Sequence, residues 1–363
     1  MRPAALPSLT GLRFLLAIFV VIYHYGAGVA EQSPGWVAAW IHAGFSTVSA
    51  FFVLSGFILA HNYIGEDGGL RGSKGAFWAA RFARTYPVYA LSVVLSFQAY
   101  LTTQATSLGE AALATAATLL CVQAWLPQAA LAINSAAWSL SVEAFLYLCF
   151  PALPGFFRGA SRRRLWWTVA GCAVLSLVAP AILLYSGTGD KEWKAVVRYN
   201  PVLHLPAFVA GIAAHRLWIS DPEQLRSAAN WLVGAAGLLI AAAFLGSARI
   251  PFEILNNGLL LIPYVALIVG LAAGGGGRFL SHRWMVQLGE ASYSLYILHL
   301  PLGLVTIPVN EELLGFGPRT WAYLVSTLAI SVLVAVGAYR AVEEPHRKSL
   351  RLRLGRSQAR CTA

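Results

Sequence analysis

Charged side chains are scarce in this chain of 363 residues, where Asp, Glu, Lys and Arg make up 11% of the sequence. Ordinary soluble domains carry about 25%. Hydrophobic residues reach 58%, and the mean hydropathy is +0.64. This composition excludes a soluble domain and indicates an integral membrane protein. Apolar runs recur up to Arg340, so we expect one membrane domain over residues 1–345 and a basic cytoplasmic tail over residues 346–363.

Cysteine is also rare, and the four cysteines show no Cys-x-x-Cys or Cys/His spacing. Their spacing argues against a disulfide framework and against a metal site. The net charge of +11 is compatible with nucleic acid, but the basic residues alternate with the apolar runs as membrane topology requires. We therefore expect the lipid bilayer as a partner and no nucleic acid.

Apolar windows of about 17 to 25 residues predict an all-α, polytopic fold with about ten transmembrane helices. They lie near residues 12–30, 44–62, 85–103, 137–157, 165–185, 201–219, 231–248, 252–273, 292–308 and 320–340. A full crossing by residues 110–125 would place the arginine cluster at 158–164 outside, against the positive-inside tendency. We interpret that segment as a short re-entrant or non-spanning piece, which leaves both termini in the cytoplasm.

The first apolar run has an alternative interpretation as a secretory signal peptide, with Arg2, an apolar core and small residues at 27–30. Arg13 and His24 interrupt that pattern, so we favour a retained membrane helix. Ionisable groups are costly inside a bilayer and are functional candidates. Their separation of eleven residues places them about 20° apart around the helix and about 16 Å apart along it.

Glu143 is a second ionisable group inside a predicted span, at a depth similar to that of His24. A carboxylate within reach would orient the imidazole and raise its basicity, as a general base requires. The alternative is a buried hydrogen bond between helices. Arg81 and Arg84 lie three residues apart on one helical face, and with Arg13 they form a candidate site for a phosphate-bearing ligand. Ordinary positive-inside anchoring is the competing explanation for these arginines.

Small and polar residues mark two further spans. Ser55 and Gly56 lie about midway through the second span, where a packing contact between helices is the simpler interpretation. Tyr296 and His299 lie three apart and can line one cavity, although a packing role is equally open for His299. After the last span, Pro345 is expected to end the helix.

Taken together, these strings resemble the acyltransferase-3 family of multi-span membrane O-acyltransferases, which modify bacterial surface sugars and some secreted natural products. The pattern of Arg13, ten residues and His24 is typical of the family. The strings FFVLSGF, RFARTYP, WSLSVE, SYSLYILH and VEEP follow in the family's order. Each string is weak alone, but the ordered set is specific and covers almost the whole chain.

The resemblance implies about ten membrane helices in the bacterial inner membrane and no permanently bound cofactor. It implies acyl-CoA, often acetyl-CoA, as the co-substrate. The implied acceptor is a hydroxyl of a carbohydrate or glycosylated molecule, such as exopolysaccharide, lipopolysaccharide or a glycosylated metabolite. One departure lies in HLPAFVAG, where His204 and Ala207 replace the basic and acidic residues of many relatives.

The resemblance implies that Arg13 and His24 are essential. It also implies that the same site is lined by Arg81, Arg84, Ser55, Trp138, Ser139, Glu143, Tyr296 and His299. Our hypothesis assigns catalysis to His24, Glu143 and Arg13, and coenzyme binding to Arg13, Arg81 and Arg84. It assigns substrate binding to Ser55, Trp138, Ser139, Tyr296 and His299. A transporter or flippase for a lipid-linked saccharide is the competing class, because intramembrane His and Glu also relay protons, but no inverted repeat is visible. A non-catalytic scaffold leaves the buried ionisable groups without a purpose.

Overall fold

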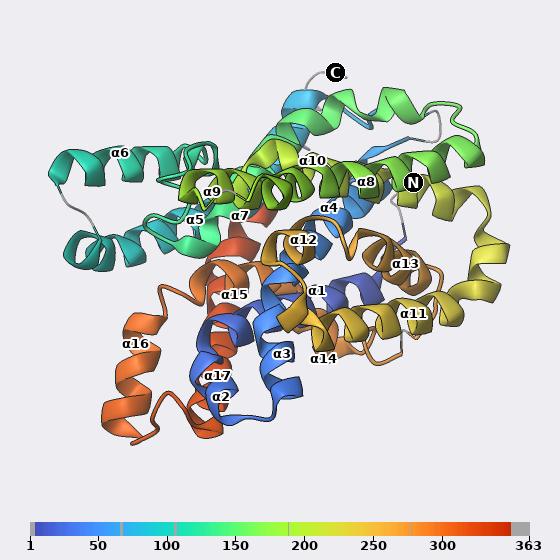
Figure 1. Ribbon diagram of the computed structural model, residues 1–363. Coiled ribbons are helices and arrows are strands. Elements are labelled where there is room, and N and C mark those ends of the chain that lie inside the picture. The colour runs from blue at the N-terminus through green and yellow to red at the C-terminus, as the bar shows by residue number, and fades with distance from the viewer. Residues whose placement is uncertain (1–3, 66–67, 105–106, 188, 277, 350–363) are drawn as a thin grey trace.

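Helices form the architecture of the protein (Figure 1). The computed structural model describes residues 4–65, 68–104, 107–187, 189–276 and 278–349. Within these ranges the only β pairing is an isolated bridge between Ile64 and Leu70. The expected all-α fold is therefore confirmed.

The α-helices vary widely in length, and several are joined by short 3-10 turns. They are α1 (Pro7–Tyr25), α2 (Ala27–Gln32), α3 (Gly35–Ala43), α4 (Thr47–Tyr63), α5 (Lys74–Thr103), α6 (Leu108–Leu119), α7 (Trp138–Cys149), α8 (Arg162–Ser186), α9 (Lys191–Tyr199), α10 (Pro201–Ser220), α11 (Pro222–Leu245), α12 (Phe252–Asn257), α13 (Leu261–Ala272), α14 (Arg283–Glu290), α15 (Ser292–Leu298), α16 (Gly303–Pro308) and α17 (Trp321–Ala338).

Seven helical segments of the described chain are long and apolar enough to cross a membrane. They are Pro7–Tyr25, Gly35–Tyr63, Arg162–Ser186, Lys191–Ser220, Pro222–Leu245, Phe252–Ala272 and Trp321–Ser349. An eighth crossing results if Ser292–Leu298 and Gly303–Leu313, which meet at a 75° bend, count as one span. A polytopic membrane protein is confirmed, whereas the expected number of ten spans is not.

Two of the expected spans, near residues 85–103 and 137–157, do not qualify as membrane crossings, and the physical reason differs between them. α5 is 30 residues long, but Tyr, Ser and Thr side chains and Gln98 reduce the apolar character of its second half. α7 has 12 residues, about 18 Å at 1.5 Å per residue, because 3-10 turns containing Pro151 and Pro154 follow it. α6 also has 12 residues, which is too short for a hydrocarbon core of about 30 Å.

Side chains that accept backbone hydrogen bonds mark where many of the helices begin. Ser73 and Ser161 cap α5 and α8, while Asn200 and Asp221 cap α10 and α11, each followed by a proline. These residues satisfy N–H groups that have no partner inside the helix. At the other end of α8, Gly187 adopts a φ of 61°, which glycine tolerates without steric cost.

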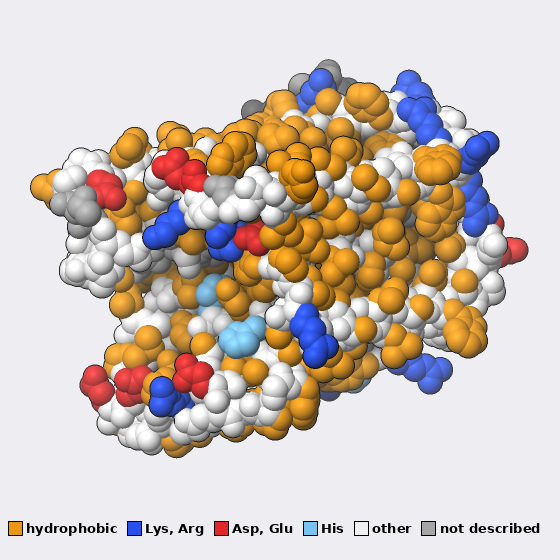
Figure 2. Space-filling model, viewed as in Figure 1, with side chains coloured by type: hydrophobic (Ala, Val, Ile, Leu, Met, Phe, Trp, Pro, Cys, Tyr) orange, Lys and Arg blue, Asp and Glu red, His pale blue; other side chains and the backbone are white. Residues whose placement is uncertain are grey.

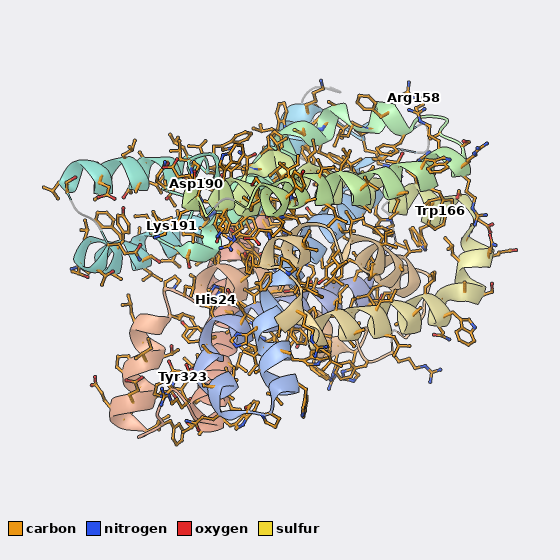
Figure 3. The ribbon with its side chains drawn as sticks, viewed as in Figure 1. His24, Arg158, Trp166, Asp190, Lys191 and Tyr323 are labelled. Carbon is orange, nitrogen blue, oxygen red and sulfur yellow. The ribbon has the colours of Figure 1, made fainter. Side chains whose placement is uncertain are left out.

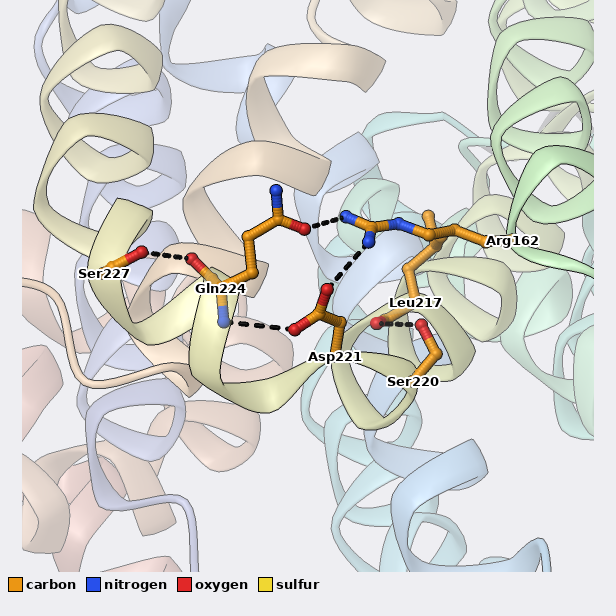
Figure 4. Close-up of polar contacts among 6 residues, drawn as sticks. All are labelled: Arg162, Leu217, Ser220, Asp221, Gln224 and Ser227. Atoms are coloured by element: carbon orange, nitrogen blue, oxygen red, sulfur yellow. Dashed lines mark hydrogen bonds and ion pairs between the residues drawn. The ribbon is translucent and has the colours of Figure 1, made fainter.

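Helix α8 runs across much of the molecule, and α5 and α6 extend beyond its C-terminal end (Figure 1). Arg158 and Trp166 lie near the N-terminal end of α8, and Asp190 and Lys191 lie near its opposite end (Figure 3). At the first end, Arg162 contacts the carboxylate of Asp221 at 2.8 Å (Figure 4). This contact joins the start of α8 to the connection between α10 and α11.

The core contains a close crossing of α4 and α10 that depends on glycine. An added Cβ at Gly56 would lie 2.0 Å from the carbonyl oxygen of Phe208. One at Gly211 would lie 2.0 Å from the carbonyl oxygen of Val53. The two backbones therefore approach each other through reciprocal glycines, and the packing interpretation of Gly56 is confirmed.

We expect Gly211→Ala to lower the free energy of unfolding by about 1–3 kcal/mol, because the new methyl group forces the two helices apart. Thermal unfolding of the purified protein in detergent measures this change. Gly234→Ala in α11 is the matched control, since an added Cβ at Gly234 has no neighbour within 4 Å. Equal melting temperatures for the two variants would contradict the close crossing.

The last helix does not end at Pro345, so that expectation is wrong. A π-helical turn over Tyr339–Glu343 is followed by helix up to Ser349. Proline removes one backbone N–H and clashes with the carbonyl of the preceding turn. The wider π turn relieves this conflict. Residues 350–363, which form most of the expected tail, lie outside the described residues.

Candidate functional site

A pocket that is partly open to the surface lies between α1, α4, α5, α7 and α15. Seven of the predicted site residues line it: Arg13, Ser55, Arg81, Arg84, Ser139, Glu143 and Tyr296. We call it the arginine pocket, after Arg13, Arg81 and Arg84. The structure thus brings together, from five helices, residues that lie far apart in the sequence.

The guanidinium groups of the arginine pocket have many unused hydrogen bond donors. Arg81 donates one hydrogen bond to the hydroxyl of Tyr63 at 2.9 Å, but its Nε is buried without a partner. Within the described part of the chain, neither the guanidinium of Arg13 nor that of Arg84 makes a hydrogen bond. Each guanidinium carries five N–H groups, so the pocket offers donors to an anionic ligand.

Glu143 lies in the arginine pocket and not beside His24. Its carboxylate accepts a hydrogen bond from the hydroxyl of Tyr147 one turn later on α7, and it interacts electrostatically with Arg13 and Arg84. The expected pairing of Glu143 with His24 is therefore wrong. A similar depth in the membrane does not make two helices neighbours, since α1 packs mainly on α14 and α4, whereas α7 packs mainly on α10.

Glu343 is a buried acidic residue that the sequence pattern did not assign to the site. Its side chain is 1% exposed, and one carboxylate oxygen accepts a hydrogen bond from Ser294 at 3.1 Å. The other oxygen is buried without a partner among the described residues. Glu343 interacts electrostatically with Arg84 and Arg13, so it is a second counter-charge to the arginines. An acidic residue inside VEEP, at the end of an apolar helix, was the available signal.

Hydroxyl groups from α7 and α15 form part of the wall of the arginine pocket. The Oγ of Ser139 lies 2.8 Å from the hydroxyl of Tyr296. Both hydroxyls also contact the carbonyl oxygen of Ala136, at 3.1 Å and 3.2 Å. These bonds connect the two helices at the wall of the pocket and hold the phenol of Tyr296 in place.

Trp138 does not line the pocket, although it precedes Ser139. Its ring packs against Phe52, Tyr199 and His204, with centroid distances of 6.1, 5.1 and 5.3 Å. His204 is buried, and its Nε2 lies 3.0 Å from the carbonyl oxygen of Arg198. The HLPAFVAG segment therefore supplies packing and one internal hydrogen bond beside the site.

The two predicted histidines lie next to each other and do not line the arginine pocket, and the ring of His299 lies 6.1 Å from that of Tyr296. Nδ1 of His24 lies 2.9 Å from the carbonyl oxygen of Val20 and 3.3 Å from Nε2 of His299. Nδ1 of His299 lies 2.6 Å from the carbonyl oxygen of Tyr296. The hydroxyl of Tyr25 donates to the carbonyl oxygen of His299 at 2.6 Å.

His24 is partly exposed at one face of the molecule. Figure 2 shows this face hollowed between two lobes, one formed by α5, α6 and α9 and the other by α2 and α16. A histidine lies in the hollow at the position where Figure 3 labels His24. We call this feature the histidine hollow. It lies at the same end of the molecule as Asp190 and Lys191, opposite Arg158.

Metal ligands do not gather in the described part of the chain, where no group of three or more His, Cys, Asp or Glu side chains has a suitable arrangement.

Comparison with known proteins identifies the family. A family model described as an acyltransferase domain matches residues 6–340. The chain belongs to the acyltransferase-3 family. Its relatives include acyltransferase MdmB of Streptomyces mycarofaciens, 29% identical, with 100% of this chain and 96% of MdmB aligned. O-acetyltransferase OatA of Staphylococcus aureus strain NCTC 8325 is 26% identical, with 95% of this chain and 58% of OatA aligned.

Peptidoglycan O-acetyltransferase OatA of Listeria monocytogenes is 25% identical, over 94% of this chain and 56% of its own length. The chain thus spans nearly all of MdmB and just over half of each OatA protein. No solved structure matches it significantly. The acyltransferase-3 resemblance is confirmed, and the protein is an O-acyltransferase with a polytopic membrane domain.

Proposed function

We propose that the protein transfers an acyl group, such as acetyl, from cytoplasmic acyl-CoA to a hydroxyl of a carbohydrate or glycosylated acceptor. The acceptor lies on the other side of a bacterial inner membrane. One observation carries the proposal. Three arginines with unused donors line a pocket that also contains Tyr296, and Tyr296 adjoins a histidine pair of which His24 is partly exposed. Donor and acceptor then approach the reaction centre from opposite ends of the molecule.

The arginine pocket suits the phosphates and the apolar arm of the donor. Guanidinium groups match phosphate oxygens in geometry, and the phosphates of coenzyme A would accept hydrogen bonds from the unused donors of Arg13, Arg81 and Arg84. Phe51 and Phe52 provide an apolar wall for the pantetheine arm. Arg13 and His24 lie about 16 Å apart along α1, a distance that an extended pantetheine arm covers.

The proposed chemistry uses His24 as a general base. Its imidazole takes the proton from the acceptor hydroxyl while that oxygen attacks the thioester carbonyl carbon, and the carbon–sulfur bond then breaks to release the coenzyme A thiolate. Ser139 and Ser55 are the proposed donors to the developing oxyanion. Glu143, placed beside the arginines, balances the charge of Arg13 and does not orient His24.

The acceptor is assigned to the histidine hollow. The positive-inside rule places the end that carries Arg158 and Arg162 in the cytoplasm. The histidine hollow, at the opposite end of α8, then faces outside. The similarity to OatA proteins, named as an O-acetyltransferase and a peptidoglycan O-acetyltransferase, supports a sugar-containing acceptor.

Two measurements test this function against transport. Mass spectrometry of surface glycans and secreted metabolites from cells with and without the gene should show a shift of one acyl unit. In envelope vesicles of known orientation, radiolabelled acetyl-CoA should label the acceptor only when it is supplied on the cytoplasmic side. Movement of a saccharide across the vesicle membrane without consumption of acetyl-CoA would instead favour a transporter or flippase.

A further inference from the structure

We propose that His299 is a positioning residue that holds the imidazole of His24 in the Nδ1–H tautomer, so that the lone pair of Nε2 faces the acceptor. The geometric part of this inference stands on the two rings alone. Its catalytic consequence rests on the proposed function of His24. His299 thereby takes the orienting role that the sequence pattern suggested for Glu143.

Two backbone carbonyls determine which ring nitrogens carry hydrogen. A carbonyl oxygen only accepts hydrogen bonds, so Nδ1 of His299, 2.6 Å from the oxygen of Tyr296, carries an N–H. For the same reason Nδ1 of His24, 2.9 Å from the oxygen of Val20, carries an N–H. The neutral His299 ring then has its lone pair on Nε2, which accepts from Nδ1–H of His24 at 3.3 Å. The opposite assignment would direct lone pairs at both carbonyls.

The Val20 carbonyl favours the Nδ1–H tautomer of His24, but it does not by itself fix the direction in which the ring points. Val20 lies one turn before His24 on the same helix, and its oxygen also serves the backbone of α1. His299 comes from the end of α15, so its contact determines where the His24 ring lies relative to the rest of the site. His299 is itself held firmly, since its side chain is 0% exposed and Tyr25 donates to its carbonyl oxygen.

The remaining ring nitrogen, Nε2 of His24, is the one that general-base catalysis needs. Among the described residues, Nε2 of His24 makes no hydrogen bond, and the side chain is partly exposed in the histidine hollow. Both ring nitrogens of His299, by contrast, are occupied and enclosed. His299 therefore has no free atom with which to contact a substrate, and this argues against the substrate-binding role predicted for it.

Two substitutions at His299 separate positioning from simple packing. His299→Asn places an amide where Nδ1 lies, which keeps a donor for Tyr296 but leaves no atom near His24. His299→Gln extends one bond further and places an amide oxygen close to the position of Nε2, where it can accept from His24. Gln is therefore the rescuing variant, and Asn is the disabling one.

Nitrogen solid-state NMR of the full-length protein in lipid, with isotope-labelled histidine, reads the tautomer without any substrate. The His24 signals are assigned by their loss in His24→Asn. We expect a protonated Nδ1 and an unprotonated Nε2 in the wild type and in His299→Gln, and mixed or broadened signals in His299→Asn. A protonated Nε2 in the wild type, or an unchanged spectrum in His299→Asn, would overturn the proposal.

The catalytic consequence is measured in envelope vesicles with radiolabelled acetyl-CoA. His299→Asn should lower kcat about 10- to 100-fold, by analogy with the loss of groups that orient metal-binding histidines, with an unchanged KM for acetyl-CoA. His299→Gln should recover most of the rate. A rise in KM with constant kcat would assign His299 to substrate binding. Should His24→Ala prove fully active while the NMR result holds, the proposed function fails and the positioning of the ring stands.

Discussion

His24→Ala should lower the rate of acyl transfer about 100- to 10,000-fold, which is the usual loss when a general base is removed. Nε2 of His24 is the free imidazole nitrogen of the histidine pair, and among the described residues no carboxylate contacts this pair to take over proton abstraction. The effect should fall on kcat, because the arginines that bind the donor are unchanged. The measurement is transfer of label from radiolabelled acetyl-CoA to glycans in vesicles, normalised to inserted protein.

His282→Ala is the matched control for this experiment. His282 is exposed, and it precedes α14 without a side-chain hydrogen bond that caps the helix. We expect its variant to retain wild-type activity, membrane insertion and melting temperature. A correctly inserted His24→Ala protein that retains the wild-type rate would show that the base lies elsewhere.

Arg81→Ala should raise the KM for acetyl-CoA about 10- to 100-fold, because hydrogen bonds to charged groups contribute about 1.5–3 kcal/mol each. The KM for the acceptor should stay constant, since the acceptor is assigned to the histidine hollow. Arg81 lies at the pocket with an unused Nε. Lys74→Ala, at the exposed start of the same helix, is the control and should leave both KM values unchanged.

A truncated donor makes this prediction specific for phosphate recognition. Acetyl-pantetheine carries the same thioester as acetyl-CoA but lacks the nucleotide and its phosphates. We expect the wild type to use it weakly, and Arg81→Ala to use it equally weakly, because this donor offers no phosphate for Arg81 to bind in either protein. If Arg81→Ala impaired both donors to the same degree, the arginine would act through the structure of the pocket and not through the phosphates.

The sequence predicts the site better than it predicts the topology. The sequence predicts that Arg13, Arg81 and Arg84 form one site. This prediction uses their helical spacing, the positions of the spans and the order of the motifs. Ten spans do not follow, because a hydropathy window does not show the early end of α7, and the polar side chains of α5 make that helix less apolar than a span requires. Pro345 does not end the last helix, since a π turn can accommodate a proline that an α-helix excludes.

Pairing between helices is the part that the sequence could not predict. Depth alone suggests a pair of Glu143 and His24, but the structure places this carboxylate with Tyr147 and the arginines. His299 is separated from His24 by 275 residues, and Glu343 reaches the arginines from the end of the last helix. Helices that are apolar on all sides have no single buried face, so the sequence pattern does not define how they rotate against their neighbours.

The sequence by itself determined membrane residence, helical structure, the family and the identity of most polar residues at the site. These properties follow from composition and local spacing, because burying an ionisable group in a bilayer is costly wherever it lies. Only the tertiary structure decided which polar groups meet. The packing of the helices placed some of these polar groups in the arginine pocket and others in the histidine hollow. That packing depends on close crossings between helices, such as the one at Gly56 and Gly211, which the local sequence pattern does not define.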